Sequence, residues 1–220
     1  MEEKQLNERE SLQLIKQMIT MAKKEQRDDG RGWIIWGWLL FLASLLTVAN
    51  LHFQWFQTFF FWNAFGLATI LIFAYEAIAG KFYKRTAAVK TYTGDLFTRL
   101  NAGFFICLIF ILVALNVGTR VIAKKYGVMD MTFINIGYAL LINLYAFWIL
   151  IYGTALNFRP SIIGAYCTWA FGAVALFVQD FEQVMLLHAG AVLAGYIIPG
   201  HLANKEFKRL KRKDKVTERV

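Results

Sequence analysis

Six long apolar stretches constrain the fold of this chain more than any other feature of its sequence. Each one approaches the roughly 20 residues with which a helix crosses about 30 Å of hydrocarbon. A chain in lipid must also satisfy its own backbone N–H and C=O groups, which a helix does within a single segment. The stretches therefore predict an all-α, polytopic membrane helix bundle with six transmembrane helices arranged as three hairpins. They lie at 33–51, 55–79, 100–118, 133–154, 161–179 and 183–199.

Basic residues between these stretches predict the orientation of the bundle. Of the 24 Lys and Arg residues, 21 fall in alternate gaps, at 1–31, 80–99, 155–160 and 200–220, and the other three fall in 119–132. Lys and Arg accumulate on the cytoplasmic side of membrane proteins. We therefore expect both termini to lie in the cytoplasm, an N-in/C-in topology.

The same pattern divides the chain into three parts. Residues 1–31 are expected to form a cytoplasmic amphipathic helix and a linker, residues 32–200 a six-helix transmembrane domain, and residues 201–220 a basic cytoplasmic tail. The first part is too rich in charge to span a membrane, although its apolar residues recur at helical spacing. It can lie in the membrane interface, dock on the cytoplasmic end of the bundle, or bind a partner protein. The candidate partner-binding residues are Leu12, Ile15, Met18 and Ile19.

The basic tail accounts for much of the net charge of +9. Between Lys205 and Lys215, seven of eleven residues are Lys or Arg. Each base near an anionic leaflet adds about 1 kcal/mol of attraction. Anionic lipid is therefore the expected partner of this segment, and contact with a protein or a nucleic acid is the alternative. We expect no direct binding of nucleic acid, because the charge lies beside predicted membrane ends.

Several residues predict how the spans begin, end and pair. Trp33, Trp36 and Trp38 are expected to form an aromatic belt that anchors the first span at the interface. Pro199 and Gly200 are expected to kink or end the last helix.

A stripe of small residues on the fifth span suggests a packing face. Gly164, Thr168 and Gly172 are spaced four apart, so one side of this helix allows close approach of another helix. This face predicts either pairing with the last span or a homo-oligomer.

Glu76 is the only acid inside a predicted span. An ionisable group at the centre of a transmembrane helix costs roughly 2.5–3.5 kcal/mol on insertion scales, so it needs an explanation. Glu76 can pair with Arg99 or Arg159 at the same membrane level, or it can bind a ligand or carry a proton. His201, after Pro199, is expected to face the cytoplasm, where it can meet Glu76.

A second set of polar residues is expected at a common depth near the outer surface. His188, Asn63, Asn116 and Asn135 would line a shallow outward pocket if the spans are placed as above. The alternative is that they form hydrogen bonds between helices, which contribute about 0.6 kcal/mol on average in membranes.

Motifs typical of enzymes are missing from the sequence. We find no HExxH, no GxSxG and no glycine-rich phosphate loop. Cys107 and Cys167 fall in different spans, and no CxxC or Cys/His cluster offers a metal or redox site. The sequence therefore predicts a protein without catalytic residues, metal or cofactor.

Several short runs resemble an uncharacterised group of small six-span bacterial inner-membrane proteins. They are Asn7–Ile15 with Met18 and Ile19, Ile35–Gly37, Phe158–Pro160, Ile162–Gly164, and Ile197–His201, which reads IIPGH. No activity is established for that group, so the resemblance transfers no functional residue. It implies a bacterial inner-membrane location and, through neighbouring genes for winged-helix regulators, a membrane component of a regulatory pair.

Two functions are therefore expected from the sequence. The first is a non-enzymatic inner-membrane regulator, adaptor or sensor whose N-terminal helix engages a cytoplasmic partner. The alternative is a transporter or channel-like carrier for a small solute, possibly oligomeric, that uses the polar groups near His188 or Glu76.

Overall fold

A computed structural model describes residues 29–82, 92–127 and 131–217, with the side chains of 73–98 and those beyond 212 described only in part. Every regular element within these ranges is a helix, and the described residues contain no strand. The elements are α2 (Arg31–Phe53), α3 (Phe60–Phe82), α4 (Tyr92–Tyr126), α5 (Met131–Ala155), α6 (Arg159–Ala175), α7 (Phe181–Val192), the π-helix η1 (Leu193–Ile197) and α8 (Ile198–Thr217).

The helices confirm that the chain is all-α and compatible with a membrane. Four stretches are long and apolar enough to cross a bilayer: α2, residues Arg99–Tyr126 of α4, α5, and the continuous stretch Phe181–Arg212. Helix α6 has 17 residues, and the described apolar part of α3 covers Phe60–Ile72. Six crossings and the orientation of the termini therefore stay predictions.

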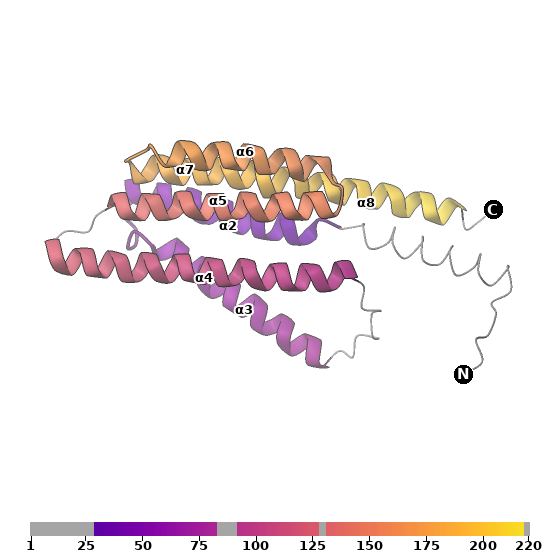
Figure 1. Ribbon diagram of the computed structural model, residues 1–220, viewed down its shortest axis with the longest axis horizontal. Coiled ribbons are helices and arrows are strands. Elements are labelled where there is room, and N and C mark those ends of the chain that lie inside the picture. The colour runs from indigo at the N-terminus through magenta and orange to yellow at the C-terminus, as the bar shows by residue number, and fades with distance from the viewer. Residues whose placement is uncertain (1–28, 83–91, 128–130, 218–220) are drawn as a thin grey trace.

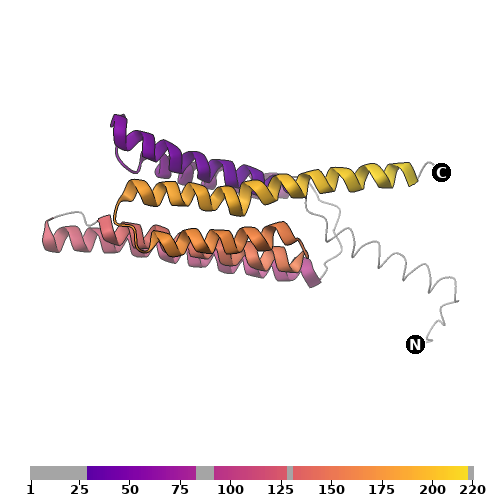
Figure 2. The same ribbon diagram turned by 90° about the horizontal axis from the view of Figure 1, so that it is seen from above.

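A tight body of four helices forms the centre of the molecule. Helix α5 makes its most extensive contact with α6, and α2 makes its most extensive contact with α7 (Figures 1 and 2). Helix α4 lies along α5, whereas α3 contacts α2 and then diverges from the bundle (Figure 1). We call the end with residues 29–31, 155–159 and 198–217 the terminal end, and the end with residues 53–60, 126–131 and 175–181 the loop end.

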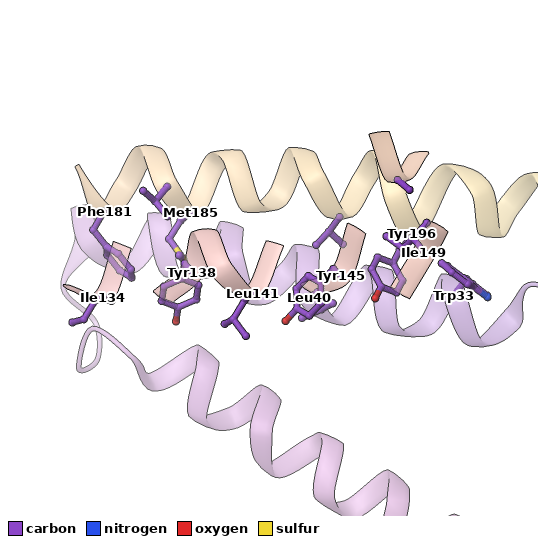
Figure 3. Packing of buried hydrophobic residues seen from close by; sticks show 13 residues of the cluster. Trp33, Leu40, Ile134, Tyr138, Leu141, Tyr145, Ile149, Phe181, Met185 and Tyr196 are labelled. Atoms are coloured by element: carbon purple, nitrogen blue, oxygen red, sulfur yellow. The ribbon is translucent and has the colours of Figure 1, made fainter. Parts of the chain in front are cut away.

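Aromatic side chains fill much of the core between α2, α5 and α7 (Figure 3). Trp33 is one of them, with 9% of its surface exposed and its ring 4.7 Å from Tyr152 and 5.1 Å from Tyr196. The prediction that Trp33 anchors the helix at the membrane surface was therefore wrong. Trp38, on the other side of α2, is 41% exposed, so its contact with the membrane interface stays a prediction. The tryptophans of the sequence predicted an aromatic belt at the membrane interface. Whether each ring points into the core or outward depends on which face of α2 meets α8 and α5.

Small residues let α6 approach α7 and η1 closely. The Thr168 hydroxyl lies within hydrogen-bond distance of two carbonyl oxygens, Gly164 O at 2.8 Å on its own helix and Ala191 O on α7 at 3.1 Å, which share its single proton. A Cβ added to Gly164 would lie 2.7 Å from Ala194 O, closer than real Cβ contacts. The predicted pairing of the fifth and last spans is thereby confirmed.

The third small residue of this stripe, Gly172, packs against Asn143 of α5. Gly164, Thr168 and Gly172 are therefore all buried within one chain. A homo-oligomer through these three residues stays a prediction, but the stripe offers it no exposed surface.

The sequence predicted that the last helix is kinked or ends at Pro199 and Gly200. The helix does not end there. It continues through α8 to Thr217. The reason is the π-helix η1, in which the Ile198 N–H donates to Leu193 O five residues back. The wider turn just before Pro199 relaxes the crowding that a proline ring causes in a regular α-helix. Residues 201–217 are consequently a helical extension of the bundle.

Candidate functional site

His188 lies at the centre of a polar and aromatic cluster inside the bundle. Its side chain on α7 is 0% exposed, and its Nδ1 is 2.8 Å from Ser44 Oγ on α2. Ser44 faces α7 because it belongs to a stripe of buried, mostly small residues on α2, formed with Gly37, Leu40 and Thr47. This stripe brings two backbones together and leaves one hydroxyl at the imidazole.

The hydrogen bonds around Ser44 indicate which nitrogen of the His188 imidazole carries the proton. The Ser44 hydroxyl donates its single proton to Leu40 O at 2.9 Å. The contact with His188 is therefore satisfied when the imidazole donates from Nδ1–H to Ser44 Oγ. Nε2 is then the unprotonated nitrogen, an acceptor that is buried and has no hydrogen-bond partner among the described residues.

Three aromatic rings surround the imidazole nearly at right angles. Their centroids lie 5.2 Å (Trp62), 5.7 Å (Tyr145) and 6.2 Å (Tyr138) from that of His188. Trp62 comes from α3, and its buried Nε1–H also has no partner among the described residues. The cluster thus holds one unpaired acceptor and one unpaired donor on neighbouring rings, a complementary pair for a small hydroxylic molecule.

Polar contacts tie the loop end together. The Asn135 amide on α5 donates from Nδ2 to Gln179 O at 2.6 Å. Asn50 closes the turn between α2 and α3, since its Oδ1 accepts from Phe56 N at 2.8 Å. His52 Nε2 lies 3.0 Å from Glu182 Oε1 and links the ends of α2 and α7.

The four residues predicted to line a shallow outward pocket do not come together. His188 and Asn135 are buried, whereas Asn63 and Asn116 are exposed, and Asn116 reaches only Leu112 O, at 3.5 Å, on its own helix. None of the hydrogen bonds in the described chain joins two of them. The alternative, hydrogen bonding between helices, is confirmed for His188, whereas Asn135 bonds to the loop between α6 and α7. Depth along a span was predictable from the sequence, but the direction of each side chain around its helix was not.

The remaining predicted residues lie at the terminal end or outside the described side chains. Arg159 is exposed at the first turn of α6, and His201 is exposed on α8. Glu76 lies on α3, but its side chain is outside the described residues, so its pairing with Arg159 or His201 stays a prediction. The predicted partner-binding residues Leu12, Ile15, Met18 and Ile19 also lie outside the described residues.

A cavity of about 140 Å³ opens at the terminal end. The start of α2, the turn between α5 and α6, and the first turns of α8 form its walls. Most of its lining residues are apolar, and the polar ones are Asn157, Ser161 and Glu206. The main lining residues are Trp33, Tyr152, Leu156, Phe158, Phe207 and Leu210.

Sequence reasoning missed the polar residues of α2 and the role of Trp62. A signal for the first was present, because Gly37, Ser44, Thr47 and Asn50 recur at intervals of seven and three residues along one helical face. Nothing in the sequence identified Trp62, since its partners come from α5 and α7.

The described residues contain no group of three or more His, Cys, Asp or Glu side chains that could hold a metal ion. Cys107 and Cys167 are exposed on the outside of α4 and α6. Comparison with protein-family models, curated proteins and solved structures found no match to this chain.

Proposed function

We propose that this protein is a non-enzymatic integral protein of a bacterial inner membrane that tethers a regulatory interaction to the membrane. In this proposal the chain crosses six times, both termini are cytoplasmic, and the N-terminal helix engages a soluble partner. The protein acts as a regulator, adaptor or sensor.

One observation carries the proposal. Helix α8 extends well past the helical body at the terminal end, where the described chain also begins (Figures 1 and 2). Its bases Lys205, Lys208, Arg209, Lys211 and Arg212 are exposed. A charged helix at the end of the bundle where the N-terminal segment joins the described chain offers more than lipid anchoring requires, because an unstructured basic tail binds anionic lipid equally well.

The interior of the bundle supports a rigid platform. Buried Ser44, Thr168 and Asn135 each bond to a neighbouring element or to their own helix. The imidazole of His188 is enclosed by three aromatic rings. These contacts help to fix the arrangement of the helices, while Asn135 Oδ1 and His188 Nε2 have no hydrogen-bond partner among the described residues.

Crosslinking in the native membrane, followed by purification, tests this function. We expect a soluble protein to co-isolate at a stoichiometric level with the full chain and to be lost when residues 1–27 are deleted. A double substitution on the apolar face, Leu12→Glu with Ile15→Glu, should also lose it. The matched control, Gln13→Glu with Gln17→Glu, changes the opposite face and should keep it. Retention of the partner by the deletion variant would refute the proposal.

A second candidate function is transport of a small solute. The unpaired His188 Nε2 and Trp62 Nε1 favour it, because they present an acceptor and a donor inside the bundle. If this function holds, His188→Ala or Glu76→Gln alters solute flux in proteoliposomes while insertion and yield stay unchanged. Equal flux in the wild type and both variants would leave the regulatory function as the better account.

A further inference from the structure

The cavity at the terminal end is bordered by an apolar stripe on α8. Ala203, Phe207 and Leu210 recur at intervals of four and three residues, so they share one face of the helix. All three are half-buried, whereas the bases between and beyond them are exposed. The stripe continues the cavity away from the helical body along α8.

The described chain begins beside this stripe and is held there. Asn204 Nδ2 donates to Asp29 O at 2.7 Å. Gly30 has a φ of 67°, a left-handed conformation, and a Cβ at this position would lie 2.4 Å from Gly200 O and 3.1 Å from the Ala203 Cβ. The glycine is therefore required by both conformation and space. Residues 1–28 consequently join the described chain at the foot of α8, next to the cavity.

We propose that the apolar face of residues 1–28, which carries Leu12, Ile15, Ile19 and Ala22, docks on the α8 stripe and into the cavity at the terminal end. The length of the segment suffices, since 28 helical residues extend about 42 Å and the part of α8 from Asn204 to Thr217 extends about 20 Å. Two amphipathic helices joined at one end bury their apolar faces by packing antiparallel.

The docking adds a regulatory step to the proposed function, and only the competition with a soluble partner rests on that function. The face that would bind a soluble partner is the face that docks on α8, so the partner and α8 compete for it. Docking is measured in the isolated protein, however, so its failure can be distinguished from the absence of a partner.

Thiol labelling of purified protein tests the docking. In a background in which Cys107 and Cys167 are replaced by serine, Leu210→Cys places a thiol on the stripe. Arg212→Cys places the control thiol two residues on, about 200° around the helix. We expect a water-soluble maleimide to label Leu210→Cys at least tenfold more slowly in the full chain than in the chain that lacks residues 1–27, and to label Arg212→Cys equally in both.

A second variant tests the result without a deletion. Ile15→Glu with Ile19→Glu should restore fast labelling of Leu210→Cys, whereas Gln13→Glu with Gln17→Glu should not. Slow labelling in every variant would mean that lipid or the bundle covers the stripe, and fast labelling in the full chain would mean that nothing docks there. Either result overturns the proposal.

Discussion

At the residue scale, the buried polar groups carry most of the specificity of this bundle. Most side chains on α2 and α7 are apolar, so hydrophobicity does not select a unique contact between them. The Ser44 and His188 pair does, because only one rotation of α2 against α7 brings Oγ and Nδ1 to 2.8 Å. Hydrogen bonds between membrane helices average about 0.6 kcal/mol and reach about 1.7 kcal/mol.

A double-mutant cycle on Ser44 and His188 measures this contribution. We expect Ser44→Ala and His188→Ala each to lower the free energy of unfolding in detergent or lipid, and the coupling energy to fall near 1 kcal/mol, because one buried hydrogen bond is shared. Thr69→Ala is the control, since its hydroxyl bonds only to Phe65 O on its own helix. A coupling energy indistinguishable from zero would show that the contact does not stabilise the fold.

At the element scale, close contacts between helices depend on glycines. The sequence shows where the glycines are but not how closely a neighbouring helix approaches each one. The sequence predicted that Gly164 lies on a packing face, and the structure places it against the backbone of η1. Gly103, on α4, has nothing within 4 Å of the position of a Cβ. The spacing of Gly164 with Thr168 and Gly172 indicates a packing face, but only the neighbouring helix shows how close the contact is at each glycine.

Alanine at these two positions should therefore have opposite effects. Gly164→Ala forces α6 and η1 apart, and we expect a loss of roughly 1–3 kcal/mol of stability. Gly103→Ala adds a methyl group facing open space and removes backbone freedom from the unfolded chain, so we expect no loss and a gain of up to about 1 kcal/mol. Thermal unfolding of the two variants in one detergent gives the comparison. An unchanged midpoint for Gly164→Ala would contradict the close contact.

At the scale of the whole molecule, α6 decides whether the chain crosses the membrane six times. Its 17 residues span about 26 Å, close to the thickness of the hydrocarbon core. It also packs along α5, in the most extensive contact between two helices of the described chain. A helix in that position is expected to cross together with its neighbours.

Labelling from the two sides of the membrane tests this crossing. In a background in which Cys107 and Cys167 are replaced by serine, Arg159→Cys places a thiol at the first residue of α6 and Gln179→Cys places one after its end. Both native residues are exposed. In intact cells, a membrane-impermeant maleimide should label Gln179→Cys and spare Arg159→Cys until the membrane is opened. Labelling of both thiols from the same side would exclude a six-span, N-in/C-in topology.

The sequence by itself determined the fold class, the membrane environment and the approximate position of each helix. The reason is that the length of an apolar stretch is a local property of the sequence, and a helix of that length matches the thickness of the hydrocarbon core. The tertiary structure alone decided which faces meet. Trp33 belongs to the core rather than to an aromatic belt, His188 meets Ser44 rather than Asn63 or Asn116, and Pro199 lies within a continuous helix. These outcomes depend on helix rotation and on a π turn. The small and polar residues of α2 indicate which of its faces is buried, but nothing in the sequence indicates which helix covers that face or where the π turn lies.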